Sequence, residues 1–183
     1  TEVAEKRTLI SATQNGSTEN HTLIEVFLGD GLSVENNKTL YYRAQGRSKA
    51  ASSSYYFSEV ISTTKFEENS WYTIRFMGSF ANRTMKLYIN GSLDASLSNA
   101  FRNTNNTYTW NTTNYYFGKT ARTDDPTALP FKGYVNSLYI GSSSSTPPEE
   151  DFYRYDAYFR ERLGIVLDTT HTYYNKPLIM GEY

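Results

Sequence analysis

The sequence has no cysteine, almost no net charge and no long apolar run, and each absence excludes a class of function. Without cysteine there is no thiol catalysis, no Cys-ligated zinc and no disulfide framework. The 18 Lys and Arg residues against 19 Asp and Glu residues lack the positive excess that nucleic-acid binding needs. No stretch approaches the ~20 apolar residues of a membrane-spanning helix. We therefore expect neither a nucleic-acid partner nor a membrane span.

The start of the sequence carries no signal segment of basic and then apolar residues. Because the sequence opens at Thr1 instead of Met, we expect a processed or cut chain, and the missing signal says nothing about its destination. A length of 183 residues is typical of one domain of roughly 150 residues with an extension.

Aromatic residues make up 16% of the chain, mostly as 17 Tyr and 10 Phe, and Ser, Thr and Asn fill much of the rest. Aromatic side chains favour pleated, half-buried sheets, and Ser, Thr and Asn favour the turns between strands. Short strand-like runs punctuated by Gly, Asn and Asp predict antiparallel strands at 8–12, 22–28, 39–44, 115–118 and 131–140. Gly133 in the last run predicts a bulge or a close backbone approach. The stretch 46–54 is expected to be an exposed loop.

The clearest strands form a hairpin. Residues 71–77 and 85–93 each alternate between two faces and are joined by a short polar loop. Within the second segment, Asn90-Gly91 predicts a tight type I′ turn, because both residues tolerate positive φ.

The character of the sequence changes at 142–145, which is expected to be a linker. Thr146-Pro147-Pro148-Glu149 has the form of a capping box with Pro at the first helical position. Apolar residues then follow at spacings of three and four, namely Phe152, Tyr155, Phe159 and Leu163. The pattern predicts a helix over 147–163 that stops at Gly164.

Four segments carry a family resemblance by their order and spacing: 71–74, 87–93, 116–118 and 131–140. The Trp-initiated strand, the aliphatic-Tyr-x-Asn-Gly hairpin and the late Phe-x-Gly-x-aliphatic strand are similar to those of the laminin-G-like, concanavalin A-like jelly-roll superfamily. The resemblance implies an all-β, antiparallel jelly-roll β-sandwich over 1–141. It also implies that the helix after the linker, over 142–164, packs on the sandwich as a cap. The residues themselves predict an extended tail over 165–183.

Members of this superfamily usually begin with further strands, which here would precede residues 8–12. The resemblance therefore implies that the chain starts partway into the sandwich and leaves an open sheet edge at its N-terminal strand. Because open edges are normally covered or paired, we expect a neighbouring chain or an upstream segment to complete this edge.

Some relatives of this fold are glucanases with a Glu-x-Asp-x-Glu cluster, in which paired carboxylates act as nucleophile and acid. No such cluster occurs here. Glu67-Glu68 is expected in a turn, and Glu149-Glu150-Asp151 is expected at a helix start, where negative charge meets the helix dipole. His21 and His171 are far apart in the sequence, and no nucleophile elbow, His-Glu-x-x-His motif or phosphate-binding loop is present. We expect a non-catalytic protein.

The Asn- and Thr-rich stretch 103–115 places aromatic rings in a polar segment. This combination suits a sugar, because an aromatic ring stacks on the C–H face of a pyranose while amides bond its hydroxyls. We predict carbohydrate binding through Tyr108, Trp110 and Asn111, with Arg122 from the next loop. The alternative is that both rings pack beneath the loop.

The loop 122–126 contains Asp124 and Asp125, whose carboxylates could hold a structural Ca²⁺ ion. The family resemblance also implies calcium near such loops. Calcium takes 6–8 oxygen ligands, and Asp-Asp-Pro is also an ordinary turn, so a turn without metal stays open. Asp30 and Asp94 are weaker candidates.

Glycosylation sequons of the form Asn-x-Ser/Thr occur more often than chance gives. They lie at Asn15, Asn20, Asn37, Asn82, Asn90, Asn105 and Asn111. They predict a glycosylated extracellular chain, and the alternative is that Asn- and Thr-rich turns create sequons incidentally.

The C-terminal region carries more aromatic surface than one helix face buries. We predict a docking interface through Tyr173, Tyr174, Leu178 and Met180, because interfaces favour Tyr and Met. A strand bound across the same domain would give an identical sequence pattern.

Two functions fit these patterns. The first is a non-catalytic binding or adhesion module that recognises a glycan or a surface ligand through its rim loops. The second is a structural or decoration subunit of a larger assembly, such as a virion, a fibre or a cell-surface filament. Both imply an extracellular, cell-surface or virion-surface location.

Overall fold

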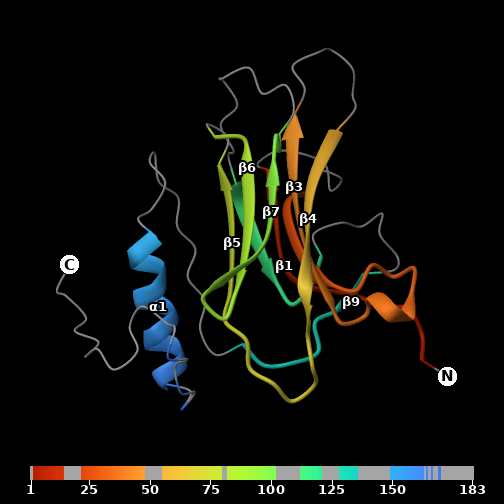
Figure 1. Ribbon diagram of the computed structural model, residues 1–183. Helices are drawn as coiled ribbons and strands as arrows, with labels where there is room; N and C mark the ends of the chain where they lie inside the picture. The colour runs from red at the N-terminus through yellow and green to blue at the C-terminus, as the bar shows by residue number, and fades with distance from the viewer. Residues whose placement is uncertain are drawn as a thin grey trace.

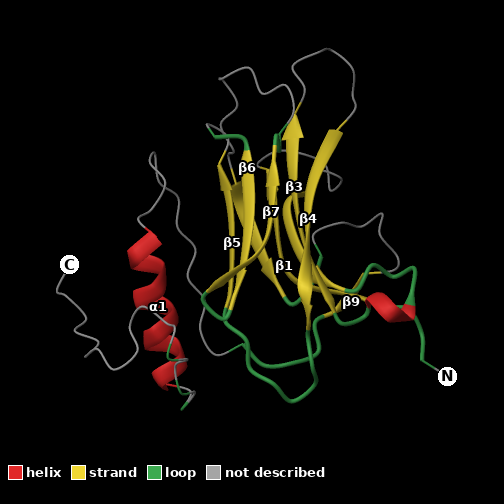
Figure 2. Cartoon of the chain, in the orientation of Figure 1, coloured by secondary structure: helices red, strands yellow, loops and turns green. Residues whose placement is uncertain are grey.

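The computed structural model describes residues 2–14, 22–47, 55–79, 82–101, 112–120, 128–135 and 149–162, together with Gly164, Val166 and Thr169. Within these residues the strands form two facing sheets, and one α-helix lies beside them (Figure 1). Figure 2 shows strands in the body of the molecule and helical segments at its two flanks. The predicted all-β, antiparallel sandwich with a C-terminal helix is confirmed.

The larger sheet has six strands in the order β4-β3-β2-β1-β8, and β9 also pairs with β1. Its members are β1 (Lys6–Gln14), β2 (Thr22–Leu28), β3 (Thr39–Arg47), β4 (Tyr55–Lys65), β8 (Thr112–Phe117) and β9 (Ala128–Pro130). Neighbouring strands are antiparallel except for β9, which runs parallel to β1.

The first strand lies inside this sheet, with β2 on one side and with β8 and β9 on the other. The prediction of an open edge at the N-terminal strand is therefore wrong. The strand-like pattern of 8–12 does not reveal that two short segments from the second half of the chain pair with it. A neighbouring chain or an upstream segment that completes some other edge stays a prediction.

The smaller sheet has three described strands in the order β5-β6-β7, namely β5 (Ile74–Ser79), β6 (Thr84–Ile89) and β7 (Ser92–Ser98). The predicted hairpin and its turn are confirmed, since Asn90 and Gly91 have φ of 52° and 83°. The first strand begins at Ile74 instead of Trp71. The carbonyl of Thr73 still accepts a hydrogen bond from Asn90 N–H at 2.9 Å.

Two further strand boundaries differ from those that the sequence predicts. β3 continues through Gly46 and Arg47, which pair with Tyr56 and Tyr55, so the first two residues of the expected loop are in a strand. Residues 131–135 are not in a strand, because the pairing with β1 is made earlier, by β9. The close approach at Gly133 involves a side chain: a Cβ there would lie 2.7 Å from the Phe131 ring.

The core lies between the two sheets. Its largest fully buried side chains include Tyr42, Leu40, Met85, Leu87 and Phe101. The rings of Tyr42 in β3 and Phe76 in β5 have their centroids 5.2 Å apart, so they join the sheets by direct contact. Alternation along each strand sends one set of side chains into this core and the other set to the outer face.

Asp94 of β7 also connects the two sheets, through hydrogen bonds to β4. Its Oδ2 accepts a hydrogen bond from Thr63 N–H at 2.8 Å, and its Oδ1 accepts bonds from Thr64 N–H and from both threonine hydroxyls. β4, which carries the two threonines, is the end strand of the larger sheet. Both carboxylate oxygens thus accept hydrogen bonds from the neighbouring sheet, and the weak calcium prediction for Asp94 stays a prediction.

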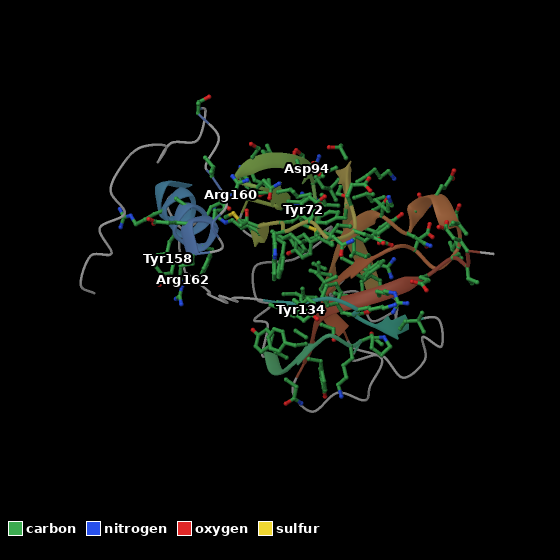
Figure 3. The ribbon with its side chains drawn as sticks, turned by 90° about the horizontal axis from the view of Figure 1, so that it is seen from below. Tyr72, Asp94, Tyr134, Tyr158, Arg160 and Arg162 are labelled. Carbon is green, nitrogen blue, oxygen red and sulfur yellow. The ribbon has the colours of Figure 1, made fainter. Side chains whose placement is uncertain are left out.

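The helix α1 (Glu149–Arg162) matches the predicted helix in its described part. Gly164 has φ of 69° and donates to the Glu161 carbonyl at 3.0 Å, which confirms the predicted stop. Figure 3 shows Arg160 on the side of α1 that faces the sandwich, and Tyr158 and Arg162 on another side. A short 3₁₀ turn, η1 (Val34–Asn36), lies at the opposite flank from α1 (Figure 1).

Replacing Asp94 by Ala should lower the free energy of unfolding by about 1–3 kcal/mol, because the hydrogen bonds to a charged acceptor between β7 and β4 are lost. Urea unfolding measures this change. Ser96→Ala, at an exposed position of the same strand, is the control and should change the free energy by less than about 0.5 kcal/mol. Equal effects of the two substitutions would contradict the role given to Asp94.

Candidate functional site

A pocket of about 370 Å³ lies on the outer face of the six-stranded sheet, on the side away from the core. The sheet contributes Lys6, Phe27, Tyr41, Arg43, Glu59 and Ile61. The loop after β2 contributes Asp30 and Leu32. Its volume is at the lower end of the range of ligand pockets, which is about 300–1,000 Å³.

The strand register explains why these side chains share one face. Val26 pairs with Tyr42 in the core, so their neighbours Phe27 and Tyr41 also pair, on the opposite face. In the same way Arg43 pairs with Glu59 across β3 and β4. A single register therefore builds both the core and the pocket.

Two stacked rings form the floor of the pocket. Phe27 and Tyr41 lie nearly parallel, with centroids 5.1 Å apart, and both are buried. Lys6 Nζ lies 4.3 Å and the Arg43 guanidinium 5.1 Å from the Phe27 ring centroid, which are cation–π distances. The rings hold the two cations in place and are themselves covered by them.

The ammonium group of Lys6 forms a buried ion pair with Glu25 of β2. Nζ lies 3.1 Å from Oε2, and the two side chains are 4% and 1% exposed. Oε1 of Glu25 also accepts hydrogen bonds from the hydroxyls of Thr8 and Thr120. Burying such a pair is favourable only when further hydrogen bonds satisfy it, and here the threonines do so.

At the pocket rim, Arg43 forms a second ion pair with Glu59. Arg43 Nη2 lies 2.7 Å from Glu59 Oε2, and Nε donates to the same oxygen at 2.9 Å. Both contacts use Oε2, so the other carboxylate oxygen, Oε1, accepts from neither Arg43 nitrogen. Each side chain is 28% exposed, so this pair is within reach of a ligand.

The loop wall depends on Gly29, which has φ of +72°. A Cβ at this position would lie 2.0 Å from the Glu5 carbonyl oxygen, so only glycine fits. The next residue but one, Gly31, donates to that carbonyl at 3.1 Å. These contacts fix Asp30 between the two glycines at the edge of the pocket.

Asp30 organises the loop, and its weak calcium prediction stays a prediction. Oδ1 accepts from the N–H groups of Leu32 and Ser33, and Oδ2 accepts from the Asn36 side-chain amide at 2.6 Å. Burial acts to raise the pKa of the Asp30 carboxyl, but these hydrogen bonds together hold that pKa below its ordinary value. Burial, aided by the negative charges of Asp30 and Glu59, raises the pKa of the Tyr41 hydroxyl.

The predicted sugar- and calcium-binding residues lie outside the described residues. They are Tyr108, Trp110, Asn111, Arg122, Asp124 and Asp125. The predicted interface residues Tyr173, Tyr174, Leu178 and Met180 also lie outside them. All of these assignments stay predictions. Within the part of the chain that the structure describes, no group of three or more His, Asp or Glu side chains is placed to hold a metal ion.

Three of the predicted glycosylation sequons fall on described residues. The Asn37 amide donates to the Val3 carbonyl and accepts from Glu5 N–H, and Asn90 Oδ1 accepts from Thr73 N–H. Asn82 is exposed at the turn before β6. Asn82 is therefore the described sequon that is best placed for modification. The sequons at Asn15, Asn20, Asn105 and Asn111 lie outside the described residues.

Sequence motifs point to none of the pocket residues except Asp30, and to Asp30 only as a weak metal-ligand candidate. The sequence pattern does not predict β4, so it does not predict the pairs that Glu59 and Ile61 make with β3. A signal was present in the predicted strands 22–28 and 39–44, where charged and aromatic residues alternate with the apolar core set. One face of these strands carries Glu25, Phe27, Tyr41 and Arg43. Such a mixture of charged and aromatic residues is typical neither of a face buried in the core nor of a face exposed to solvent.

Comparison with known proteins identifies the class to which this sandwich belongs. A family model described as the concanavalin A-like lectin/glucanases superfamily matches residues 3–149. The match covers most of the chain, so the protein belongs to this superfamily, and the resemblance to its laminin-G-like members is confirmed. Among curated protein sequences, none matches the chain significantly.

Solved structures of low similarity include the CBM40 of a Ruminococcus gnavus IT-sialidase. The free form is 20% identical over 73% of this chain and 65% of that chain, with a TM-score of 0.46. The form bound to α2,3-sialyllactose is 18% identical over the same shares, with a TM-score of 0.47. A Clostridium thermocellum S-layer domain-containing protein is 18% identical over 85% of this chain and 65% of that chain, with a TM-score of 0.40.

This chain spans about 65% of the length of each of these solved chains. With TM-scores below 0.5, the likenesses carry no argument about its ligand. A search of the described residues for a helix long and apolar enough to cross a membrane finds none.

The lowered pKa of Asp30 predicts a pH-dependent stability. A carboxyl whose folded pKa lies below its unfolded value of about 3.9 stabilises the fold above that pH, and the contribution is lost as the pH falls through the folded pKa. The free energy of unfolding of wild type minus that of Asp30→Asn should therefore be largest near pH 7 and shrink below about pH 4.

Urea unfolding between pH 7 and pH 3 measures this difference. Glu35→Gln, at an exposed position in η1, controls for the change in net charge. A difference for Asp30→Asn that stays constant over the whole range would contradict the assignment.

Proposed function

We propose that this chain is a non-catalytic binding module that recognises a glycan in the pocket on the outer face of its six-stranded sheet. Membership of a superfamily that contains lectins supports the proposal. The observation that carries it is the pocket itself, which combines an apolar wall, buried aromatic rings and paired charges in about 370 Å³. Small-ligand sites likewise combine apolar side chains with polar groups fixed in position, and here four of the eight lining residues are charged.

The walls suit the two kinds of surface of a sugar ring. Ile61 and Leu32 are exposed apolar side chains that the C–H groups of a pyranose would contact. Glu59 and Arg43 are half-buried groups that would accept from and donate to its hydroxyls. Because these side chains lie on paired strands or beside a loop fixed by hydrogen bonds, binding would cost little ordering entropy.

The state of the pocket carboxylates supports binding without catalysis. Glycosidases use two carboxyl groups on either side of the scissile bond, one of them an acid with a raised pKa. Here Glu59 is paired with Arg43, and Glu25 is buried against Lys6. The pKa of Asp30 is lowered, which is opposite to the need of a general acid. We further propose an extracellular or cell-surface location, where such modules meet glycans.

A bulky charged residue at the pocket rim tests the assignment of the site. Ile61→Arg should weaken binding to any glycan captured on an array by about tenfold or more, because the new side chain fills the pocket and adds a charge. Ile61 is 48% exposed, so the fold should tolerate the change. Leu93→Arg is the matched control, since Leu93 is 53% exposed on β7 and does not line the pocket. Unchanged binding by Ile61→Arg would remove the pocket from the proposal.

A second candidate function is a structural subunit of a larger assembly. Exposed apolar side chains in β8 and shortly after β9 favour it, including Phe117, Tyr134 and Val135. Groups of exposed apolar residues mark interaction surfaces. If this surface mediates assembly, sedimentation velocity should show self-association that Tyr134→Ser reduces. Tyr134 is 88% exposed, so its loss should not affect folding. A monomer at all concentrations would contradict this candidate.

A further inference from the structure

The charges of the pocket are matched before any ligand arrives. Lys6 is paired with Glu25 at 3.1 Å, and Arg43 is paired with Glu59 at 2.7 Å. Both cations also lie over the Phe27 ring, which restricts their movement. An incoming anion would have to break one of these pairs to obtain a cationic partner.

Asp30 adds a negative charge that no cation offsets among its described contacts. The hydrogen bonds that it accepts come from neutral donors, namely the N–H groups of Leu32 and Ser33 and the amide of Asn36. Among the described residues that line the pocket, the cations are Lys6 and Arg43 and the carboxylates are Asp30 and Glu59. Glu25, the buried partner of Lys6, is a third carboxylate beside them. The surplus is one negative charge on the loop wall.

From this charge arrangement we infer that the pocket selects neutral glycans and discriminates against acidic ones such as sialylated or uronic sugars. The inference rests on the proposed function and adds the class of ligand. A sugar carboxylate in the pocket would meet the negative charges of Asp30 and Glu59, and like charges brought together reject a ligand. A neutral sugar meets no such penalty.

The hydrogen-bonding capacity of the rim points to the same class. Arg43 binds Oε2 of Glu59 through both Nε and Nη2, and Oε1 is not used in that pair. A carboxylate oxygen accepts hydrogen bonds and donates none, so its natural partner is a hydroxyl group and not a second carboxylate. The hydroxyls of a neutral pyranose can donate to Oε1 while the ion pair stays intact.

The test compares neutral and acidic glycans with the same core. A glycan array with matched pairs identifies bound cores, and isothermal titration then measures one pair, for example lactose against 3′-sialyllactose. Binding of the neutral member about tenfold or more tightly supports the inference. Tighter binding of the acidic member overturns it and leaves the proposed function standing. Binding of no glycan at all overturns the proposed function itself.

Glu59→Gln then tests the cause of the selectivity. The substitution removes one negative charge and releases Arg43 from its ion pair, so the preference for the neutral glycan should fall about tenfold, toward equal binding of both members. Glu67→Gln is the matched control, because it breaks the exposed Lys38–Glu67 pair outside the pocket and should leave the preference unchanged. Thermal unfolding checks that both variants are folded. An unchanged preference in Glu59→Gln would overturn the inference.

Discussion

The register between β2 and β3 is the constraint on which both faces of the larger sheet depend. With Val26 opposite Tyr42, one face joins the core, and with Phe27 opposite Tyr41 the other face becomes the pocket floor. A slip of one residue would turn Glu25 and Arg43 toward the core and expose their apolar neighbours. Burying unpaired charges costs far more than any local gain could offset. The core therefore fixes the pocket, even though no pocket residue belongs to the core cluster between the sheets.

The outer face of the six-stranded sheet is unusual because some of its charged side chains are buried. Lys6 and Glu25 are almost fully buried, with Thr8 and Thr120 completing the hydrogen bonds of the carboxylate. A buried pair of this kind is weak evidence for stability, because desolvation offsets much of the attraction. The clearer consequence of this ion pair is that it fixes chain segments relative to one another. β1, β2 and the segment after β8 each contribute a polar partner, so their relative placement is specified on the outer face as well as in the core.

Much of the fold could be predicted from the sequence, and the reasons are local. The Asn90-Gly91 turn, the alternation of 71–93 and the Gly164 stop each depend on a few adjacent residues, and the structure confirms them. The internal position of β1 could not be predicted, because it depends on pairing with residues about a hundred or more positions away. The pocket could not be predicted either, because it depends on how separate strands pair. Its members come from four strands and a loop, whereas a sequence motif reveals only residues that lie within one segment, such as 103–115.

The placement of the pocket on strands has a consequence for how it would choose among ligands. A loop can move a cation toward an acidic sugar, whereas Arg43 is held by its strand, by Glu59 and by the Phe27 ring. Recognition would then depend on what the fixed groups offer, which is acceptor oxygens and apolar walls. Because an ion pair that stays intact keeps its favourable energy, a neutral ligand gains hydrogen bonds without losing the pair. An anionic ligand must first separate charges in a partly buried site, where the water that would otherwise compensate them is scarce.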